Sequence, residues 1–145
     1  YKIVFEIRRE KNPCSLCANL RRGALNSVAV ENGIRKIALG HHKDDAVETF
    51  FMNLYNEGRI GCFSPVTHLD RKDVYLIRPM IYVPEKEIKH FVKSEGIEVL
   101  PKYCPADGNT ERERVKQDLA ERERTDHGFK DRIFGAIERG IWMNS

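Results

Sequence analysis

The sequence predicts an α/β fold, in which helices accompany a mostly parallel sheet and a helical tail follows. The order of the apolar segments and the helical patterns predicts this class. Short apolar segments alternate with helical patterns up to about residue 100, and only helical patterns follow. Hydrophobic residues make up 41% of the 145 residues, enough to bury one core but not two. We therefore expect a single unit (1–145), with the sheet in about residues 1–100 and the tail in about residues 101–145.

The strands are expected at short apolar runs between polar or turn-forming residues. Three such runs occur, at residues 3–7, 36–40 and 74–79. The run 36–40, KIALG, has polar flanks on both sides and suits a buried parallel strand. Residues 97–105, IEVLPKYCP, contain two prolines and are expected to be extended.

The first helix is expected to follow Ser15, a candidate N-cap residue. Apolar residues repeat at every fourth position from Leu20 through Ala24 to Val28, and Gly33 stands where the helix should end. Leu25 and Ala29 widen this apolar stripe.

Four further helices are predicted by apolar residues spaced three or four positions apart. The second helix opens with Asp44 and Asp45 and ends near Gly58, and the third lies between Pro84 and Gly96. The tail contains a charged helix and a better-anchored one. Their apolar residues are Val115 and Leu119 in the charged helix, and Phe129, Ile133, Ile137 and Ile141 in the last helix.

The charge of the chain is nearly balanced. Twenty-five Lys and Arg against 22 Asp and Glu give a net charge of +3, which permits a nucleic-acid partner without arguing for one. In the charged helix the cations Arg112, Arg114 and Lys116 alternate with glutamates, so we expect a salt-bridged surface there. No apolar run approaches the ~20 residues of a membrane span, and no signal peptide opens the chain, so we expect a cytoplasmic protein without a membrane partner.

The segment GHHKDDAVET, residues 40–49, carries the strongest chemical signal. It places Gly40 and His41 at the end of a predicted strand and Asp44 and Asp45 at the start of the next helix. In an open α/β sheet, ligands bind beyond the carboxyl ends of the strands, so a ligand is expected here. Acidic residues at a helix start also have a simpler explanation, because they cap the first turn and complement the helix dipole. For one aspartate the simpler explanation is favoured, whereas the whole segment favours a ligand site.

Cys14 and Cys17 form a C-x-x-C pair, with Cys14 just before the first predicted helix and Cys17 in its first turn. In a reducing compartment such a pair more often binds metal or is redox-active than forms a structural disulfide. No thioredoxin-like context supports a redox pair. A structural zinc site would need further ligands. The candidates are His41, His42, Cys62 and His90. Cys62 has no partner motif and is expected to be an ordinary packing cysteine.

The segment GHHKDDAVET resembles the second nucleotide-site motif of the PP-loop ATPases, a superfamily of adenylating enzymes. CSLCANLRRGAL ahead of it and the lone cysteine in PKYCP downstream narrow the resemblance to the tRNA 2-thiocytidine synthetase group. The match runs from about residue 3 to about residue 142. It implies a partial Rossmann-like unit of the adenine nucleotide α-hydrolase type.

The resemblance implies ATP-dependent thiolation of tRNA. ATP would activate the C2 oxygen of a cytidine in the anticodon loop, at tRNA position 32, and sulfur would displace the adenylated oxygen. In this group three cysteines hold a [4Fe-4S] cluster, and they correspond here to Cys14, Cys17 and Cys104. Three thiolates leave one iron without a protein ligand, where sulfur can bind. The implied partners are tRNA, ATP and a sulfur donor of the cysteine desulfurase type.

The resemblance also implies roles for the remaining candidates. Gly40, His41, Asp44 and Asp45 would lie on the ATP side of the site. Mg²⁺ would accompany ATP, with Asp44 or Asp45 as a direct or water-bridged ligand. Arg21 and Arg22 follow the cysteines and would contact RNA phosphate or the nucleotide, although a solvated helix face remains the alternative for them.

One motif of the family is absent from these residues. PP-loop enzymes carry an S-G-G-x-D-S type loop on the first strand, and no such sequence occurs in the 145 residues. We expect the loop to lie upstream, or the chain to be a natural half-enzyme. In either case this polypeptide alone should not catalyse adenylation, and an uncovered sheet edge would favour a homodimer. The alternatives are another PP-loop tRNA-modifying enzyme, such as a 2-thiouridine-forming one, and a non-enzymatic zinc- or RNA-binding module.

Overall fold

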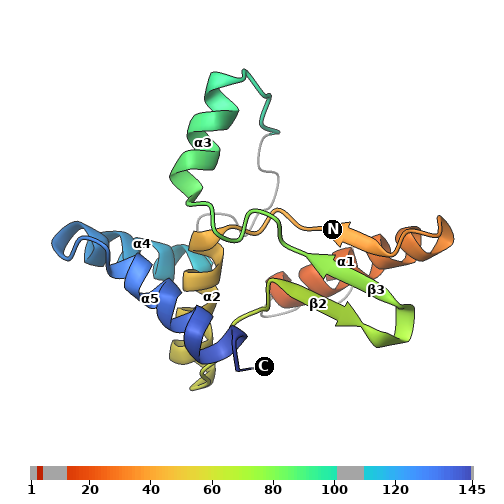
Figure 1. The fold of residues 1–145 in the computed structure, drawn as a ribbon, viewed down its shortest axis with the longest axis horizontal. Helices are drawn as coiled ribbons and strands as arrows, with labels where there is room; N and C mark the ends of the chain where they lie inside the picture. The colour runs from red at the N-terminus through yellow and green to blue at the C-terminus, as the bar shows by residue number, and fades with distance from the viewer. Residues whose placement is uncertain (1–2, 5–12, 101–109, 145) are drawn as a thin grey trace. The chain divides into compact units, whose positions relative to one another are not determined.

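The computed structural model describes residues 3–4, 13–100 and 110–144. Its helices are α1 (Pro13–Glu31), α2 (Lys43–Glu57), α3 (Glu85–Ser94), α4 (Glu111–Thr125) and α5 (Phe129–Ile137), and α5 continues into the π-helical turn η3 (Glu138–Trp142). The strands are β1 (Lys36–Ala38), β2 (Val66–Leu69) and β3 (Val74–Ile77), with the 3-10 turn η2 (Asp70–Lys72) between the last two. Helices and strands alternate up to β3 and helices alone follow, which confirms the predicted α/β class (Figure 1).

The chain forms two compact units. The first comprises residues 1–38 and 68–77, and the second comprises residues 39–67 and 78–145. The predicted helical tail belongs to the second unit together with α2. The predicted boundary near residue 100 stays a prediction.

A short sheet lies in the first unit, where β1 pairs with β3 in parallel. The register joins Ile37 to Leu76, and both side chains are buried because the apolar centre of each strand faces the interior. The strand order is β1-β3-β2. Sequence reasoning missed β2 because its residues are exposed or half-buried and show no apolar run. Of the strand predicted at 3–7, only residues 3 and 4 lie within the described residues, and these two are π-helical, so the prediction is wrong for them.

Helix α1 differs from its prediction in two ways. It begins at Pro13, so Cys14 lies inside the first turn and Ser15 is not the N-cap residue. Proline suits a first helical turn because the amide proton that it lacks would have no partner there. Of the predicted apolar stripe, Ala29 is buried at 4% exposed, whereas Leu20 is 40% and Val28 54% exposed. Only part of the stripe therefore lies on the packed face of the helix.

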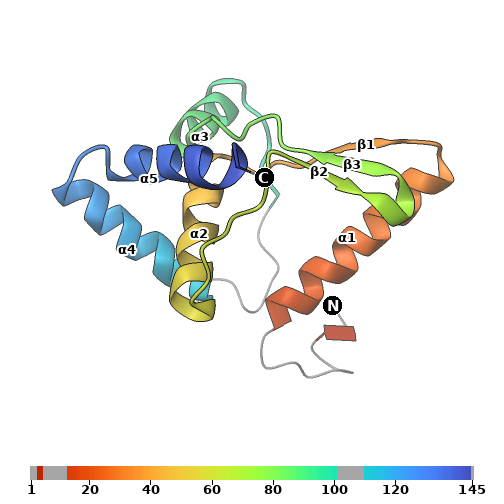
Figure 2. The same ribbon diagram turned by 60° about the horizontal axis from the view of Figure 1, so that its bottom comes forward.

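The second unit is built on α2, α4 and α5, which pack against one another (Figure 2). Its hydrophobic core confirms most of the predicted helix faces, because residues three or four positions apart meet on one side of each helix. The buried members are Ala46, Val47, Phe51, Ile81, Val115, Leu119, Phe134 and Ile137. Gly58 ends α2 with φ 60°, a left-handed conformation that glycine adopts without steric cost.

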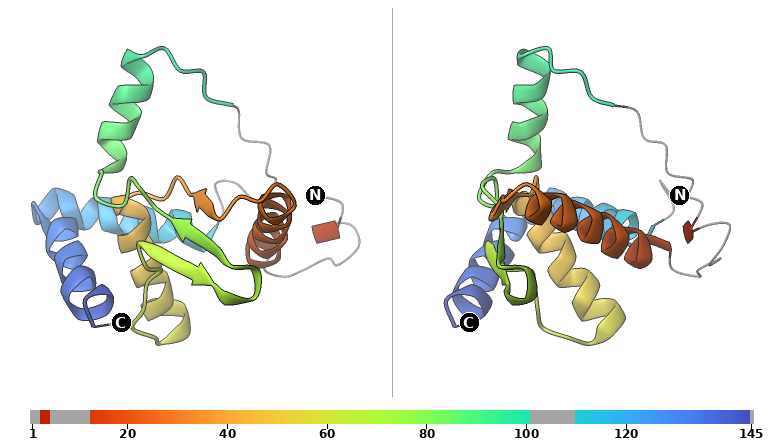
Figure 3. Two further views of the ribbon diagram at one scale, coloured as in Figure 1. Left: turned by 45° about the vertical axis from the view of Figure 1, so that its right-hand side comes forward. Right: turned by 90° about the vertical axis from the view of Figure 1, so that its right-hand side faces the viewer.

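Helix α3 projects away from the other helices of the second unit (Figures 1 and 3). It has no buried residue, and Phe91 on its predicted apolar face is 58% exposed. The helix itself was predicted correctly between Pro84 and Gly96. Within the described residues, no helix is long and apolar enough to cross a membrane.

Candidate functional site

The start of α2 carries the residues predicted for the nucleotide side of the site, and its first turn is closed by a reciprocal cap. The backbone N–H of His42 donates to Asp45 Oδ2 at 2.9 Å, and the backbone N–H of Asp45 donates to His42 Nδ1 at 3.4 Å. Two N–H groups that the helix start would otherwise leave unpaired are thereby satisfied. The simpler explanation for Asp45, a capping residue, therefore holds in the structure.

Asp44 joins the start of α2 to two other helices of the same unit. Its Oδ2 accepts the backbone N–H of Glu85 in α3 at 2.8 Å, and its Oδ1 contacts Lys130 Nζ of α5 at 2.8 Å. Burial alone would raise the pKa of the Asp44 carboxyl, but the N–H of Glu85 and the Lys130 ammonium together outweigh burial and lower that pKa. Asp44 is thus an ionised carboxylate, and each of its two oxygens contacts a donor from another helix.

These contacts predict a pH-dependent contribution of Asp44 to stability. Because its folded-state pKa is lowered, the contribution is present above the ordinary aspartate pKa of about 3.9 and is lost as pH falls through the folded-state pKa. We expect Asp44→Asn to lower the free energy of unfolding by about 1.5–3 kcal/mol at pH 7, and by less at pH 3. Urea unfolding at both pH values measures this, with Lys130→Met as the partner control. An equal loss at pH 7 and pH 3 would contradict the assignment.

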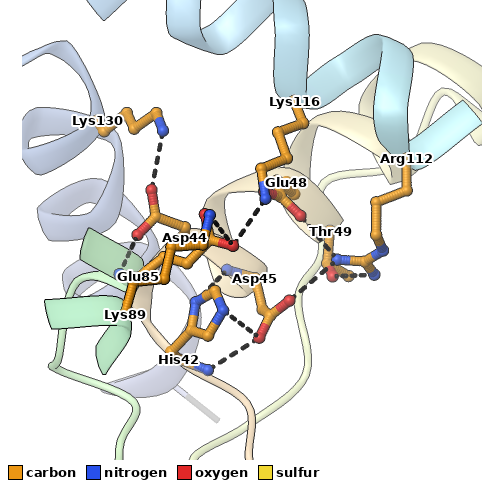
Figure 4. Close-up of polar contacts among 10 residues, drawn as sticks. All are labelled: His42, Asp44, Asp45, Glu48, Thr49, Glu85, Lys89, Arg112, Lys116 and Lys130. Carbon is orange, nitrogen blue, oxygen red and sulfur yellow. Dashed lines mark hydrogen bonds and ion pairs between the residues drawn. The ribbon is translucent and has the colours of Figure 1, made fainter. Parts of the chain in front are cut away.

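Glu48 lies one turn further along α2 and is only 3% exposed. Arg112 of α4 pairs with it, with Nη1 3.0 Å from Glu48 Oε2. The same guanidinium reaches Asp45 Oδ1 at 3.4 Å and Thr49 Oγ1 at 3.2 Å (Figure 4). Burial raises the pKa of Glu48, and Arg112 only partly opposes this.

Helix α4 carries the salt bridges that were predicted for it, but two of its cations pair with acidic side chains of other helices. Arg112 faces α2, and Lys116 Nζ lies 2.8 Å from Glu85 Oε1 in α3 (Figure 4). Arg114 fits the prediction, because it pairs with Glu111 in its own helix and its side chain is 70% exposed. Arg112 and Lys116 therefore connect α4 to α2 and α3 through ion pairs.

His41 and Gly40 precede the cap. The His41 ring lies 4.9 Å from the Phe63 ring, and its Nδ1 is buried without a hydrogen-bond partner among the described residues. Burial is the main cause that lowers the pKa of His41, so its imidazole is neutral at pH 7. Gly40 is exposed, has no left-handed φ, and a Cβ there would meet only Met80 Cε, at 3.8 Å. The described residues therefore do not themselves require glycine at position 40.

The cysteines of the C-x-x-C pair lie one turn apart at the start of α1. Both are free thiols, with Cys14 exposed and Cys17 half-buried. Cys104 lies outside the described residues, and those residues contain no group of three or more His, Cys, Asp or Glu arranged for a metal. Two free thiols at i and i+3 fit two ligands of one iron-sulfur cluster, because thiolates are the ligands such clusters use. Convergence with Cys104 stays a prediction.

Cys62 packs against the core of the second unit, as predicted for an ordinary packing cysteine. Its thiol donates to the carbonyl oxygen of Ala46 at 3.4 Å. Burial raises the pKa of Cys62 to about 12, so the thiol stays protonated at neutral pH. Arg21 and Arg22 are exposed on α1, and the Arg22 guanidinium donates to Asn19 Oδ1.

Comparison with known proteins decides between the families that such a motif could indicate. A family model described as the PP-loop domain matches residues 11–123. The chain belongs to the PP-loop domain family. This confirms the resemblance that GHHKDDAVET and CSLCANLRRGAL indicated in the sequence.

Relatives of this PP-loop chain carry a common name. This chain is 41% identical over 143 residues to the tRNA-cytidine(32) 2-sulfurtransferase of Ralstonia nicotianae. The alignment covers 97% of this chain and 46% of that protein. The protein of the same name from Dichelobacter nodosus is 38% identical and is covered to 54%. The chain spans about half the length of the curated relatives it matches.

A solved structure resembles this PP-loop chain in fold. It is the U34-tRNA thiolase NcsA from Methanococcus maripaludis with its [4Fe-4S] cluster. The TM-score is 0.73 at 28% identity, over 91% of this chain and 45% of that one. The similarity supports the α/β architecture observed here.

Sequence reasoning missed the cations that hold the start of α2. Asp45 and Thr49 lie four residues apart in the sequence, and both contact Arg112. Lys130 gave no signal, because it lies 86 residues beyond Asp44 in the sequence. Ion pairs of this kind follow from tertiary packing and not from a local pattern.

Proposed function

We propose that the full-length protein is an ATP-dependent tRNA sulfurtransferase that thiolates C2 of the cytidine at tRNA position 32. One observation carries the proposal: 97% of the chain aligns with proteins named tRNA-cytidine(32) 2-sulfurtransferase, at 41% identity in the Ralstonia nicotianae protein. The free thiols of Cys14 and Cys17 at the start of α1 add the chemistry that sulfur transfer needs.

The reaction proceeds in two displacements. The C2 oxygen of cytidine attacks the α-phosphorus of ATP, and pyrophosphate leaves. A hydrosulfide then attacks C2, the C2–O bond breaks, a proton is released, and AMP leaves with the former carbonyl oxygen. A sulfur donor of the cysteine desulfurase type would supply the sulfur as a persulfide, and a thiol reductant would give the two electrons that release it as hydrosulfide.

Cys14, Cys17 and Cys104 would hold the [4Fe-4S] cluster, which, when bound, supplies an iron without a protein ligand for the incoming sulfur. Arg21 and Arg22 follow on α1 and would contact tRNA phosphate, since guanidinium groups match phosphate oxygens in geometry and charge.

Gly40, His41, Asp44 and Asp45 would form the nucleotide side. The described residues would leave room for a side chain at position 40. Glycine there would let a ligand approach the backbone closely. Neutral His41 offers a hydrogen-bonding group that the described residues leave unpaired at Nδ1. Asp44 and Asp45 already accept bonds from the protein, so a water-bridged Mg²⁺ suits them better than direct coordination.

Metal content and nucleoside analysis test the proposal. We expect about four irons and four sulfides per chain in the full-length protein purified without oxygen. With ATP and a sulfide source it should form 2-thiocytidine in tRNA, detected by mass spectrometry of digested nucleosides. Stoichiometric zinc without iron, together with unmodified tRNA, would overturn the proposal.

A second candidate is formation of 2-thiouridine. The fold similarity to the U34-tRNA thiolase of Methanococcus maripaludis favours it, with a TM-score of 0.73. The same nucleoside digest separates the two candidates, because 2-thiouridine and 2-thiocytidine differ in mass. We place this candidate second because the chain is 28% identical to that thiolase and 41% identical to the tRNA-cytidine(32) 2-sulfurtransferase of Ralstonia nicotianae.

A further inference from the structure

We propose that Arg112 is a positioning residue for the nucleotide side of the site: its guanidinium fixes Asp45 and, through Asp45, the capped first turn of α2. The inference rests on the proposed function, since it assigns a role in ATP binding. It adds a residue that lies outside the GHHKDDAVET segment, in helix α4.

The contacts of Arg112 form a continuous chain to the cap. The guanidinium reaches Asp45 Oδ1 at 3.4 Å, and the other carboxylate oxygen of Asp45 accepts the backbone N–H of His42 at 2.9 Å. Thr49 Oγ1 lies 3.2 Å from Nη2, one turn further along α2. Because the guanidinium is planar and its donors are fixed relative to one another, bonds to Asp45 and Thr49 set the orientation of that face of α2.

Arg112 also has a separate electrostatic task. Glu48 is 3% exposed and pairs with Arg112 at 3.0 Å. A buried carboxylate that loses its partner destabilises the fold strongly, so removing Arg112 would weaken the protein whether or not Arg112 orients Asp45. The two tasks are separable, because glutamine at position 48 keeps the size of the side chain and removes the charge.

A second set of ion pairs holds the same helix start from α5. Lys130 contacts Asp44 at 2.8 Å, and Lys43 contacts Asp131 at 2.7 Å. The first turn of α2 is therefore restrained by α4 on Asp45 and by α5 on Asp44, as Figure 4 shows, and also by α5 on Lys43. With α5 still in place, loss of Arg112 should misorient the turn without releasing it.

The experiment uses four variants of the full-length protein: Arg112→Met, Glu48→Gln, the double variant Arg112→Met/Glu48→Gln, and Arg114→Met as a matched control on the exposed face of α4. Thermal unfolding reports stability, and calorimetry with ATP reports Kd. Arg112→Met should lower Tm and raise the Kd for ATP about tenfold. The double variant should recover Tm and keep the raised Kd, while Glu48→Gln and Arg114→Met should bind ATP as the unmodified protein does.

Recovery of both Tm and Kd in the double variant would overturn the proposal, because Arg112 would then only neutralise Glu48. If Arg112→Met does not fold, the double variant still decides the question. Unmodified protein that binds ATP but forms no thiolated nucleoside would defeat the proposed function, and the Kd comparison would still judge Arg112. Unmodified protein that does not bind ATP would overturn the proposal for Arg112 as well.

Discussion

Replacing Cys104 with alanine in the full-length protein should abolish both the visible absorbance of the iron-sulfur cluster and the thiolation of tRNA. On the proposed ligand set, a [4Fe-4S] cluster held by three thiolates would lose a ligand in this variant, and Cys14 and Cys17 alone would hold it too weakly to survive purification. Thiolation should fall below detection. Iron and sulfide content, the visible spectrum and nucleoside analysis measure the effect.

Cys62→Ala is the matched control for that experiment. Cys62 is packed against the core and its thiol has a pKa of about 12, raised by burial, so it is unsuited to binding iron as a thiolate. This variant should keep its cluster and its activity. Thiolation that survives in Cys104→Ala would contradict the role assigned to Cys104.

Phe134→Ala should cause the largest loss of stability among single substitutions in the second unit. Phe134 is 5% exposed, and its ring packs edge-to-face against Tyr82 and Trp142, with centroids 5.6 and 5.4 Å away. Lys43 Nζ, in the first turn of α2, lies 5.2 Å from the ring centroid. The truncation leaves a cavity where α5 meets α2, and we expect the free energy of unfolding to fall by about 3–5 kcal/mol.

Phe91→Ala on α3 is the control for this truncation, since it removes the same atoms from a side chain that is 58% exposed. It should change the free energy of unfolding by no more than about 0.5 kcal/mol. Urea unfolding followed by circular dichroism measures both variants. Similar losses in the two would show that the core of the second unit is not where the structure places it.

Elements whose packing follows a local period were predictable from the sequence. Val115 and Leu119, four positions apart in a charged segment, were sufficient to place the buried face of α4. β2 could not be found this way, because Val66–Leu69 contains no buried residue and is a strand only through its pairing with β3. In α1 the apolar period was present, but the residues it selected, such as Val28, stay exposed in the first unit.

The candidate site was likewise predictable only where its residues are adjacent in the sequence. The segment from Gly40 to Asp45 is contiguous, so its turn between a strand and a helix could be predicted from the residues alone. The partners that fix it could not, because Arg112 and Glu48 are 64 residues apart and meet only when α4 packs on α2. Alternation of charge in α4 predicted a salt-bridged surface helix, but it could not show that Arg112 and Lys116 pair with acids of α2 and α3.

Helix α3 has a mechanical consequence for the site. It projects from the second unit with no buried residue, and its first turn is fastened where the N–H of Glu85 meets Asp44 and the Glu85 carboxylate meets Lys116. Because Glu85 stands at the start of α3 and its N–H bonds Asp44 directly, the orientation of α3 and the position of the Asp44 carboxylate are coupled.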